Sequence, residues 1–185
     1  MNKTQQNLVN AFAGESQARN RYTYFASVAQ KEGYEQIAAI FLETAENEKQ
    51  HAKMFYKLLE NGNHKVESEY PIFLGSTLEN LYSASKGEHE EWSRLYKSAA
   101  QIAKEEGYKE AETVFSQVLE AEKHHEQRFL KLIEVLENKS VFEKAKETAW
   151  KCRKCGRITY GKKAPEVCPT CKHEKKYFEV LCEEY

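Results

Sequence analysis

The sequence predicts a mainly α-helical protein, with a four-helix bundle in residues 1–146 and a small metal-binding domain in residues 147–185. Three observations support this prediction. The three prolines are at positions 71, 165 and 169, so two long stretches contain no helix breaker. Apolar residues recur through both stretches at steps of three and four, which is the pattern of packed helices. All five cysteines lie in the last 34 residues, and four of them form two Cys-x-x-Cys pairs.

The first two helices follow from the stripes that they carry. In the first helix the stripe consists of Ala11, Glu15, Ala18, Tyr22, Phe25 and Ala29. In the second helix it consists of Ile37, Phe41, Thr44, Glu48, His51, Phe55 and Leu58. Gly33 separates the two helices, and Gly62 follows the second at a position where helices commonly end.

A longer connection precedes the second pair of helices. Residues 62–75 contain Gly and Pro without a helical period, so we expect a loop there. Ser76 should cap the third helix, because Glu79 completes an S-x-x-E capping box. The stripe of the third helix consists of Leu81, Ala84, Glu88, Glu91, Leu95 and Ile102. The fourth helix follows Gly107 and carries the stripe Ala111, Val114 or Phe115, Val118, Glu122, His125, Phe129, Leu132 and Leu136.

The two helix pairs are an imperfect repeat with an offset of 74 residues. The segment QKEGYE at 30–35 matches KEEGYK at 104–109, and Glu48-x-x-His51 matches Glu122-x-x-His125. Glu15 and Glu88 differ by 73, so the repeat slips by one residue there. Two short-loop helix hairpins joined by a longer crossover make a four-helix bundle.

Composition narrows the class of protein. The formal net charge is −1, and no stretch approaches the roughly 18 apolar residues of a membrane span. The N-terminal segment lacks the apolar run and cleavage site of a signal peptide. We therefore expect a cytoplasmic protein that binds neither nucleic acid nor membranes.

Charged side chains interrupt the apolar stripes of all four helices. They are Glu15, Glu48, Glu88, Glu91 and Glu122, together with His51 and His125. Burying even one unpaired carboxylate costs several kcal/mol, so five in one core need a positive partner. The Lys and Arg residues nearby lie off the stripes, namely Arg19, Arg21, Lys53 and Arg94. Metal ions are therefore the expected partner.

The Glu-x-x-His spacing suits metal binding. Residues three apart on a helix have Cβ atoms about 5–6 Å apart on one face, so Glu48 and His51 can contact one ion together. Carboxylates combined with imidazoles favour iron or manganese over zinc. Two such helices, plus glutamates from the other two, form a ligand pattern that is similar to that of di-iron carboxylate bundles.

Glu91 adds a fifth carboxylate one helical turn after Glu88. Two ferric ions with a bridging oxide carry a charge of about +4, and so do two ferrous ions. Five carboxylates face the oxidised pair of ions. If one carboxylate dissociates on reduction, the remaining four balance the +4 charge of the reduced pair. We therefore hypothesise that Glu91 binds oxidised iron and that His51 replaces it on reduction.

The four paired cysteines predict a tetrahedral metal site. Cys152 and Cys155 form one turn, Cys168 and Cys171 form the other, and backbone N–H groups in such turns can point at thiolate sulfur. In a chain without an export signal, this spacing indicates metal binding and not disulfides. Spacing alone leaves zinc and iron open. Cys182 has no partner and is not expected to be a ligand.

Together these motifs resemble the rubrerythrin family over essentially the whole chain. The matching segments are AFAGESQARNRY at 11–22, ENEKQH at 46–51, GEHEEW at 87–92, EAEKHHEQRF at 120–129, CRKCG and CPTC. The resemblance implies a ferritin-like bundle holding two iron ions and a rubredoxin-like domain holding one. A departure is Lys172, since rubredoxin usually has Gly after the last ligand cysteine, which puts one N–H to sulfur contact in doubt.

The resemblance also implies a role for each ligand. Glu15 and Glu91 would bind the first iron, with His51 as the alternate ligand. Glu88 and His125 would bind the second iron. Glu48 and Glu122 would bridge the two ions, and Cys152, Cys155, Cys168 and Cys171 would hold the third.

The activity implied by the resemblance is that of an oxidoreductase. It is a peroxidase that reduces hydrogen peroxide to water in oxidative-stress protection, with electrons relayed through the four-cysteine iron. The implied donor is rubredoxin or a flavoprotein NAD(P)H oxidoreductase. Glu91, Tyr22 and Tyr96 are candidates for the proton supply. We also expect a head-to-tail homodimer, which would shorten the electron path.

Two other functions belong to different classes. One is ferritin-like iron oxidation and storage, which has no use for an electron relay. The other is a non-catalytic zinc-knuckle module. Five lysines make the tail basic and are candidates for docking an acidic electron donor: Lys162, Lys163, Lys172, Lys175 and Lys176.

Overall fold

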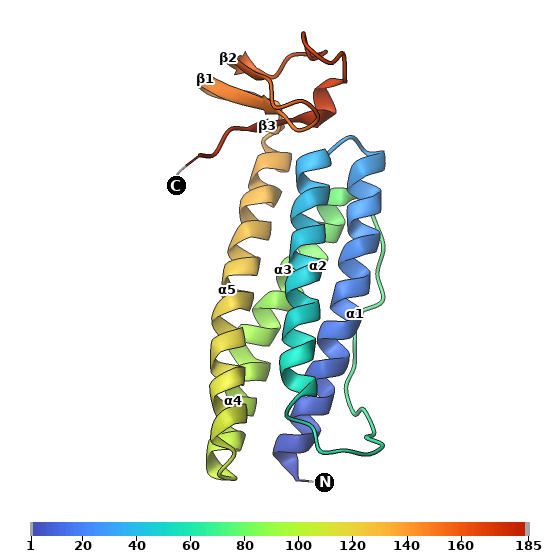
Figure 1. Ribbon diagram of the computed structural model, residues 1–185, viewed down its shortest axis with the longest axis vertical. Helices are drawn as coiled ribbons and strands as arrows, with labels where there is room; N and C mark the ends of the chain where they lie inside the picture. Colours follow the sequence, from blue (N-terminus) through green and yellow to red (C-terminus); the bar gives the residue numbers. More distant parts are fainter. Residues whose placement is uncertain (1, 184–185) are drawn as a thin grey trace.

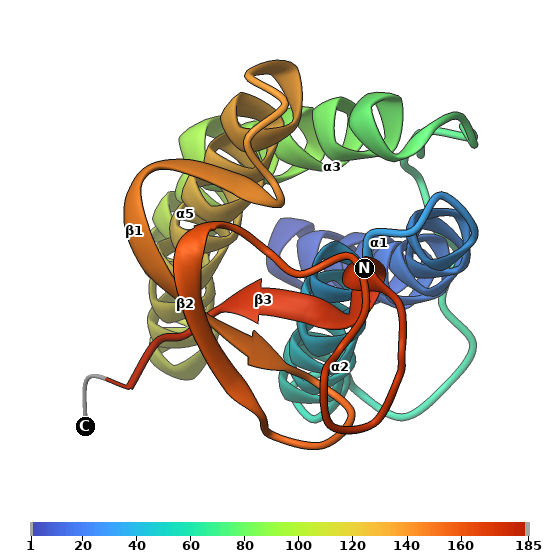
Figure 2. The same ribbon diagram turned by 90° about the horizontal axis from the view of Figure 1, so that it is seen from above.

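The computed structural model describes residues 2–183 and confirms a helical bundle with a small β-rich tail. The first hairpin consists of α1 (Lys3–Lys31) and α2 (Glu35–Tyr56). The second consists of α3 (Thr77–Glu90), the π-helix η1 (Glu91–Leu95) and α4 (Tyr96–Glu105), which together run antiparallel to α5 (Lys109–Glu137). Seen from above, α1 lies beside α2, and α3 lies beside α5 (Figure 2).

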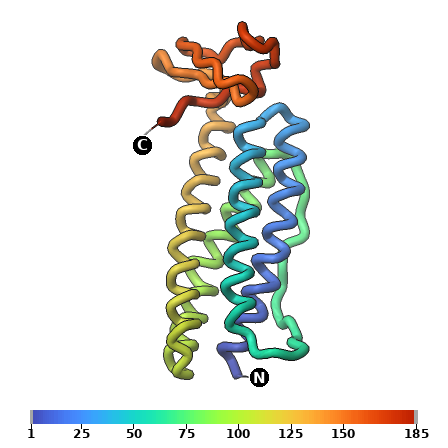
Figure 3. The backbone as a smooth tube through the Cα atoms, in the orientation of Figure 1, coloured from blue at the N-terminus to red at the C-terminus, as the bar shows by residue number. Residues whose placement is uncertain are grey.

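Local sequence explains where these helices begin and end. The side chain of Asn2 accepts a hydrogen bond from the backbone N–H of Gln5 and so caps α1. The capping box predicted for Ser76 and Glu79 is present at the start of α3. Gly33 and Gly107 have φ values of +85° and +82°, so each glycine allows the chain to reverse between two helices. The segment between α2 and α3 runs along the outside of α1 (Figure 3).

The third helix differs from the prediction of one regular helix. Residues 91–95 form a π-helix, and Trp92 fixes it to α5 by donating its indole N–H to Glu126 at 2.5 Å. A π-turn accommodates one extra residue in a helix. That extra residue accounts for the one-residue slip in the repeat, because Glu15 and Tyr22 are seven residues apart whereas Glu88 and Tyr96 are eight apart. The one-residue slip in the sequence was therefore a usable sign of the π-turn.

The bundle core consists of two apolar clusters. Phe25, Phe41 and Phe129 belong to the cluster nearer the tail, and Phe55 and Phe115 belong to the cluster nearer the N-terminus. Ring centroids lie 5.4 Å apart for Phe41 and Phe129, and 4.9 Å apart for Phe55 and Phe115. All five rings are fully buried, so each cluster is a well-packed region of hydrocarbon.

The tail forms a three-stranded antiparallel sheet above one end of the bundle (Figure 1). Its strands are β1 (Glu143–Cys152), β2 (Ile158–Lys163) and β3 (Phe178–Val180), in the order β2-β1-β3, and the 3-10 turn η2 (Lys175–Tyr177) precedes β3. Trp150 is fully buried and donates its indole N–H to the carbonyl of Gly161 at 2.9 Å.

The tail meets the bundle at the turn between α1 and α2. Tyr34 stacks on Phe142 with ring centroids 6.4 Å apart, and η2 and β3 contact α2. Helix α5 ends at Glu137 and β1 begins at Glu143, while the predicted division between residues 146 and 147 stays a prediction. No helix within residues 2–183 is long and apolar enough to cross a lipid bilayer.

Candidate metal centres

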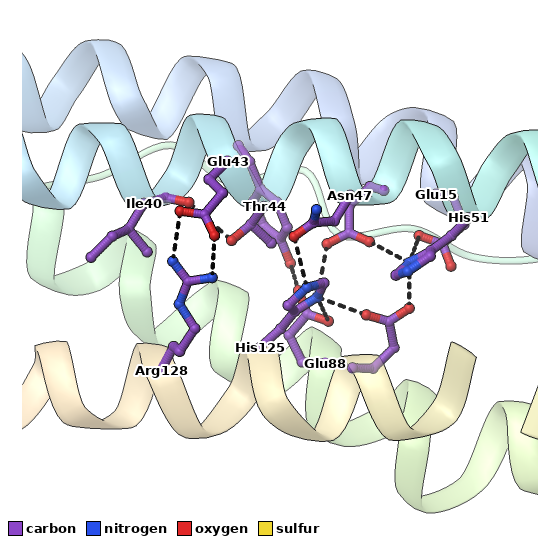
Figure 4. Close-up of polar contacts among 12 residues, drawn as sticks. Glu15, Ile40, Glu43, Thr44, Asn47, His51, Glu88, His125 and Arg128 are labelled. Atoms are coloured by element: carbon purple, nitrogen blue, oxygen red, sulfur yellow. Dashed lines mark hydrogen bonds and ion pairs between the residues drawn. The ribbon is translucent and has the colours of Figure 1, made fainter. Parts of the chain in front are cut away.

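The charged stripe residues other than Glu91 come together inside the bundle, and Figure 4 shows Glu15, His51, Glu88 and His125 among them. Six of them are buried: Glu15 on α1, Glu48 and His51 on α2, Glu88 on α3, and Glu122 and His125 on α5. The two apolar clusters lie on either side of them along the bundle axis. Each side chain is held by a long helix whose remaining stripe is packed hydrocarbon, so its position is fixed by the fold.

The six side chains form two groups of possible metal ligands. One group is Glu15, Glu48, His51 and Glu122, and the other is Glu48, Glu88, Glu122 and His125. Within each group the candidate ligand atoms lie within 4.8 Å of one another. Because Glu48 and Glu122 belong to both groups, each could offer one carboxylate oxygen to each of two ions.

The distances around the two histidines are nearly equal. The Nδ1 atom of His51 lies 3.0 Å from Glu48 Oε2 and 2.8 Å from Glu122 Oε1. The Nδ1 atom of His125 lies 3.2 Å from Glu48 Oε1 and 2.8 Å from Glu122 Oε2. The geometry therefore follows the twofold repeat of the sequence.

The donor set fits two metal ions on a second, independent ground. Despite these short distances, several buried polar atoms of the group make no well-aligned hydrogen bond within residues 2–183: Oε2 of Glu15, Oε1 of Glu48, Oε2 of Glu88, both carboxylate oxygens of Glu122 and Nδ1 of His125. Native proteins leave few buried polar atoms unsatisfied, and each costs about 1–3 kcal/mol or more when charged. Cations between these atoms would satisfy all of them. The oxygen-rich set with two imidazoles suits iron.

The electrostatics of the metal-free protein show how strained the cluster is without cations. Burial raises the pKa of Glu15 well above its usual value, and the charge of Glu122 adds to the effect. Burial and the charge of Glu48 raise the pKa of Glu88 to about 8. Burial alone would lower the pKa of His51, but the adjacent carboxylates of Glu122 and Glu48 outweigh it and raise that pKa to about 10. These directions are those expected of buried carboxylates that require a compensating positive charge.

Glu91 lies outside both groups. It is the first residue of η1, it is partly exposed, and it lines a cavity of about 1060 Å³ between α1, the crossover segment and the α3–α4 helix. The sequence placed it on the stripe beside Glu88, and the π-turn is the reason that its position differs from that of a regular helix. Its role as a metal ligand stays a prediction.

The two candidate tyrosines contact the carboxylates directly. Tyr22 donates its hydroxyl hydrogen to Glu88 Oε1, and Tyr96 donates to Glu15 Oε1 at 2.5 Å. Both rings are buried, and burial raises the pKa of each hydroxyl well above its usual value. The hydroxyls therefore keep their protons and act as hydrogen-bond donors to the site.

Arg21 differs from the sequence prediction. It was expected only to lie off the stripe, and the structure shows in addition that it is buried and lines the same cavity as Glu91. Its Nε and Nη1 atoms have no hydrogen-bond partner in residues 2–183, and its guanidinium lies 5.4 Å from the centre of the Tyr22 ring. The stripe pattern missed it because the gap between the two hairpins gives α1 a second sheltered face.

The four paired cysteines meet in the tail. Their sulfur atoms lie within 4.8 Å of one another, with 3.7 Å between Cys152 and Cys171 and 3.7 Å between Cys155 and Cys168. A tetrahedron with metal–sulfur bonds of about 2.3 Å has edges of about 3.8 Å, so the thiols fit one tetrahedral ion. Cys182 is exposed and is not a member of this group of four cysteines.

Backbone N–H groups support this site as predicted. Hydrogen bonds from the backbone N–H groups of Cys171 and Thr170 lower the pKa of the Cys168 thiol, whereas burial raises it. The hydrogen bonds outweigh burial, and the pKa is lowered to about 6. Lys172 adopts φ +63°, close to the +75° of Gly156 in the other turn. The turn after Cys171 therefore keeps its shape without glycine, and its backbone N–H donates to the carbonyl of Cys168 at 3.0 Å.

Four of the five tail lysines that are candidates for docking a donor have a partner within the chain, and their role in docking stays a prediction. Lys163 pairs with Glu143, Lys175 with Glu166 and Lys176 with Glu174. Lys172 donates to the carbonyl of Pro169. Three of the five lysines thus have a carboxylate partner within the chain, which reduces their net attraction for an acidic protein.

Comparisons with known proteins agree with this geometry. The family model described as rubrerythrin matches residues 6–133, and that of the rubrerythrin rubredoxin-like domain matches residues 150–179. Rubrerythrin of Porphyromonas gingivalis is 53% identical over 99% of this chain and 92% of its own length. A structure of nigerythrin has 34% identity and a TM-score of 0.66, covering 98% of this chain and 88% of that one.

A more distant likeness concerns the fold alone. A bacterioferritin structure from Desulfovibrio desulfuricans is 20% identical with a TM-score of 0.67, and it covers 75% of this chain and 82% of its own. The helical bundle therefore has the ferritin-like architecture, and the tail is an addition to it.

Proposed function

Because this chain belongs to the rubrerythrin family of ferritin-like di-iron proteins, we propose that it is a peroxidase that reduces hydrogen peroxide to two waters and protects the cell against oxidative stress. The supporting observation is the pair of ligand groups that share Glu48 and Glu122. Two iron ions held there would supply, in their reduced state, the two electrons that this reaction consumes. The proposed ligands are the six residues of these groups and, as a seventh, Glu91, which exchanges with His51.

The surroundings of the site support a role in proton delivery. Glu91 and Tyr96 line the cavity, so a small substrate entering it meets both groups before it meets the buried carboxylates. Burial and the charge of Glu88 raise the pKa of Glu91 well above its usual value, a direction that suits a proton donor. Tyr22 and Tyr96 hold Glu88 and Glu15 by hydrogen bonds and are the other candidate donors.

The four-cysteine site is proposed as the electron relay, with one iron in place of zinc. A metal with four protein thiolates has no open position for peroxide, so it is suited to electron transfer only. The proposed donor is rubredoxin or a flavoprotein NAD(P)H oxidoreductase in the cytoplasm. The tail covers one end of the bundle (Figure 1), whereas the ligand groups lie between its two apolar clusters. This separation favours a head-to-tail homodimer with electron transfer between chains.

Anaerobic mixing of the fully reduced protein with hydrogen peroxide tests the activity. We expect one equivalent of peroxide to consume two electrons and to restore the visible absorption of the thiolate-bound ferric ion afterwards. Glu91→Gln should lower turnover by about 10²- to 10⁴-fold if this carboxyl delivers a proton. Glu90→Gln is the matched control, because Glu90 is the neighbouring residue and its carboxylate pairs with Arg94 at the surface.

Two outcomes would replace this proposal. Large shells in solution that fill with iron would indicate storage. A colourless protein that contains only zinc and does not react with peroxide would indicate a binding module. A monomer with full turnover would contradict the dimer without affecting the peroxidase assignment.

A further inference from the structure

The α3–α4 helix has one residue more than α1 between two side chains that reach the candidate ligands. Glu88 and Tyr96 are 1% and 4% exposed, and Tyr96 donates to Glu15 Oε1 at 2.5 Å. A regular helix turns by about 100° per residue, so two residues eight apart would differ in direction by about 80°. The π-helix η1 lies between them and takes up the extra residue. Tyr96 therefore faces Glu15 because the extra residue is placed before it.

The same helix has a second possible arrangement. If the extra residue lay after Tyr96, the seven-residue spacing of a regular helix would bring Leu95 to the face that carries Glu88. The stripe predicted from the sequence includes Leu95 for this reason, whereas the structure leaves that side chain 40% exposed. Burial of a leucine is favourable, so contacts of the π-helix must favour the arrangement that is observed.

Contacts with α5 hold the π-helix in its observed place. The carboxylate of Glu126 accepts the indole N–H of Trp92 on Oε2 at 2.5 Å, and its Oε1 lies 3.0 Å from Nδ1 of His89. The rings of His89 and Trp92 meet edge to face with centroids 5.0 Å apart. The Glu126 side chain is 14% exposed, so water competes little for these contacts. One carboxylate of α5 thus binds a residue before the π-helix and a residue within it.

The other half of the repeat lacks this acceptor. At the offset of 74 residues, Glu126 corresponds to Ala52 in the first hairpin, and an alanine side chain accepts no hydrogen bond. Helix α1 is a regular α-helix in which Glu15 and Tyr22 are seven residues apart. The acceptor and the extra residue therefore occur in the same half of the chain, which is the pattern expected if one holds the other in place.

We propose that Trp92 and Glu126 are positioning residues, because their hydrogen bond keeps the π-helix before Tyr96 and so keeps the Tyr96 hydroxyl on Glu15. Without this bond, the extra residue moves past Tyr96, Leu95 turns inward and the hydroxyl leaves the carboxylate. Every contact used lies within one chain and has both of its partners there, so the inference holds for a monomer and for a dimer. It concerns the place of Tyr96 and does not rest on peroxide turnover.

The contact can be changed in steps. Trp92→Phe keeps an aromatic ring and removes the N–H. Glu126→Leu removes the acceptor, and Glu126→Gln keeps an acceptor oxygen for the indole. Glu90→Gln is the matched control, because the carboxylate of Glu90 pairs with Arg94 across the same turn but at the surface.

The first measurement is NMR of the tyrosine hydroxyl protons in the full-length protein loaded with Zn²⁺, with Tyr96→Phe and Tyr22→Phe to assign the signals. A hydroxyl bound to a buried carboxylate exchanges its proton slowly. We expect the two variants that break the contact to lose the Tyr96 signal, and Glu126→Gln and the control to keep it. The Tyr22 signal should persist in all four variants, because its acceptor Glu88 precedes the π-helix.

These signals can also refute the proposal. A Tyr96 signal that survives in either Trp92→Phe or Glu126→Leu would overturn it, and so would loss of that signal in Glu126→Gln or in the control. Loss of the Tyr96 and Tyr22 signals together would also overturn it, since that result indicates general loosening of the bundle and not a change in the place of one hydroxyl.

The second measurement asks whether the effect of Trp92→Phe can be reversed without restoring the N–H. A crystal structure of Trp92→Phe should show Leu95 turned inward and Tyr96 turned out. Adding Leu95→Gln disfavours the inward position of that side chain and should restore the Tyr96 signal. Deletion of Ser93, within η1, removes the extra residue and should make the signal insensitive to Trp92→Phe. Recovery by either change supports the proposal, and failure of both contradicts it.

These results are separate from the peroxidase assignment. If the signals respond as expected but the parent protein does not reduce peroxide, the proposed function is wrong and the positioning role stands. If the parent protein reduces peroxide but the Tyr96 signal does not respond, the positioning role is wrong and the function stands.

Discussion

The bundle and the tail differ in how much their hydrophobic cores depend on the candidate metal ligands. In the bundle, the ligand groups lie between two apolar clusters whose side chains belong to other residues, such as Phe41 and Phe115. In the tail, the buried core is Trp150, Cys152, Ala164, Cys168 and Phe178, so two of its five members are themselves candidate metal ligands. The bundle can therefore form its site before the metal arrives, whereas the tail needs the metal to complete its core.

Removal of all metal ions should have the largest effect on the difference between the bundle and the tail. Binding free energies of about 10–16 kcal/mol for structural four-ligand sites appear as folding free energy, so we expect the tail to unfold while the bundle stays helical. The measurement is loss of the indole N–H signal of Trp150, together with retention of far-UV circular dichroism. Cys168→Ser should reproduce the effect and Cys182→Ser should not, since Cys182 is exposed and outside the group. A tail that stays folded without metal would remove the distinction.

After metal removal, the stability of the bundle should depend on pH, because its buried carboxylates and imidazoles have shifted pKa values. The raised pKa values of Glu88, about 8, and His51, about 10, mean that the folded state binds more protons than the unfolded state above about pH 4.5. The free energy of unfolding should therefore fall as pH rises from about 5 to 10. Hydrogen bonds from His125 and His51 outweigh burial and lower the pKa of Glu48 to about 2, so stability should also fall in acid below about pH 4.5.

Denaturant unfolding at a series of pH values measures this dependence. The metal-loaded protein is the control, because cations replace the protons and should remove the loss of stability on the alkaline side. Metal-free protein that becomes more stable between pH 6 and 9 would contradict the assigned proton balance.

The smallest expected effect compares the two cysteine turns of the tail. Lys172 has a positive φ that disfavours a side chain by about 1–2 kcal/mol, and Gly156 has the same backbone conformation without that penalty. Lys172→Gly should therefore stabilise the tail by about 1 kcal/mol, and Gly156→Lys should destabilise it by a similar amount. Metal release by a chelator, followed by visible absorption, measures both. Equal release rates in the two variants would show that backbone strain does not limit this site.

Much of the fold and of the candidate site could be predicted because the relevant interactions are local in sequence. The spacing of Glu48 and His51 on one helical face, the capping box at Ser76 and the paired cysteines each depend on residues within one or two turns. The π-turn at Glu91 left a weaker sign, the one-residue slip in the repeat, which is readable only when the two hairpins are aligned.

Features that depend on contacts between hairpins could not be predicted in the same way. The burial of Arg21 depends on the width of the gap between α1 and α3, and the ion pairs of the tail lysines depend on how its loops close. The partner of His125 lies 78 residues away in the chain, on another helix. None of these distances is encoded in a helical period.

The sequence by itself determined which side chains can approach metal ions, because helical geometry fixes the direction of each residue relative to its near neighbours. The tertiary structure alone decided which of them meet, since only packing of the two hairpins brings Glu48 and Glu122 between both histidines and leaves Glu91 beside a cavity. It also decided that His125 of α5 contacts Asn47 of α2. The physical reason is that direction along a helix is a local property, whereas distance between helices depends on the volume of every side chain packed between them.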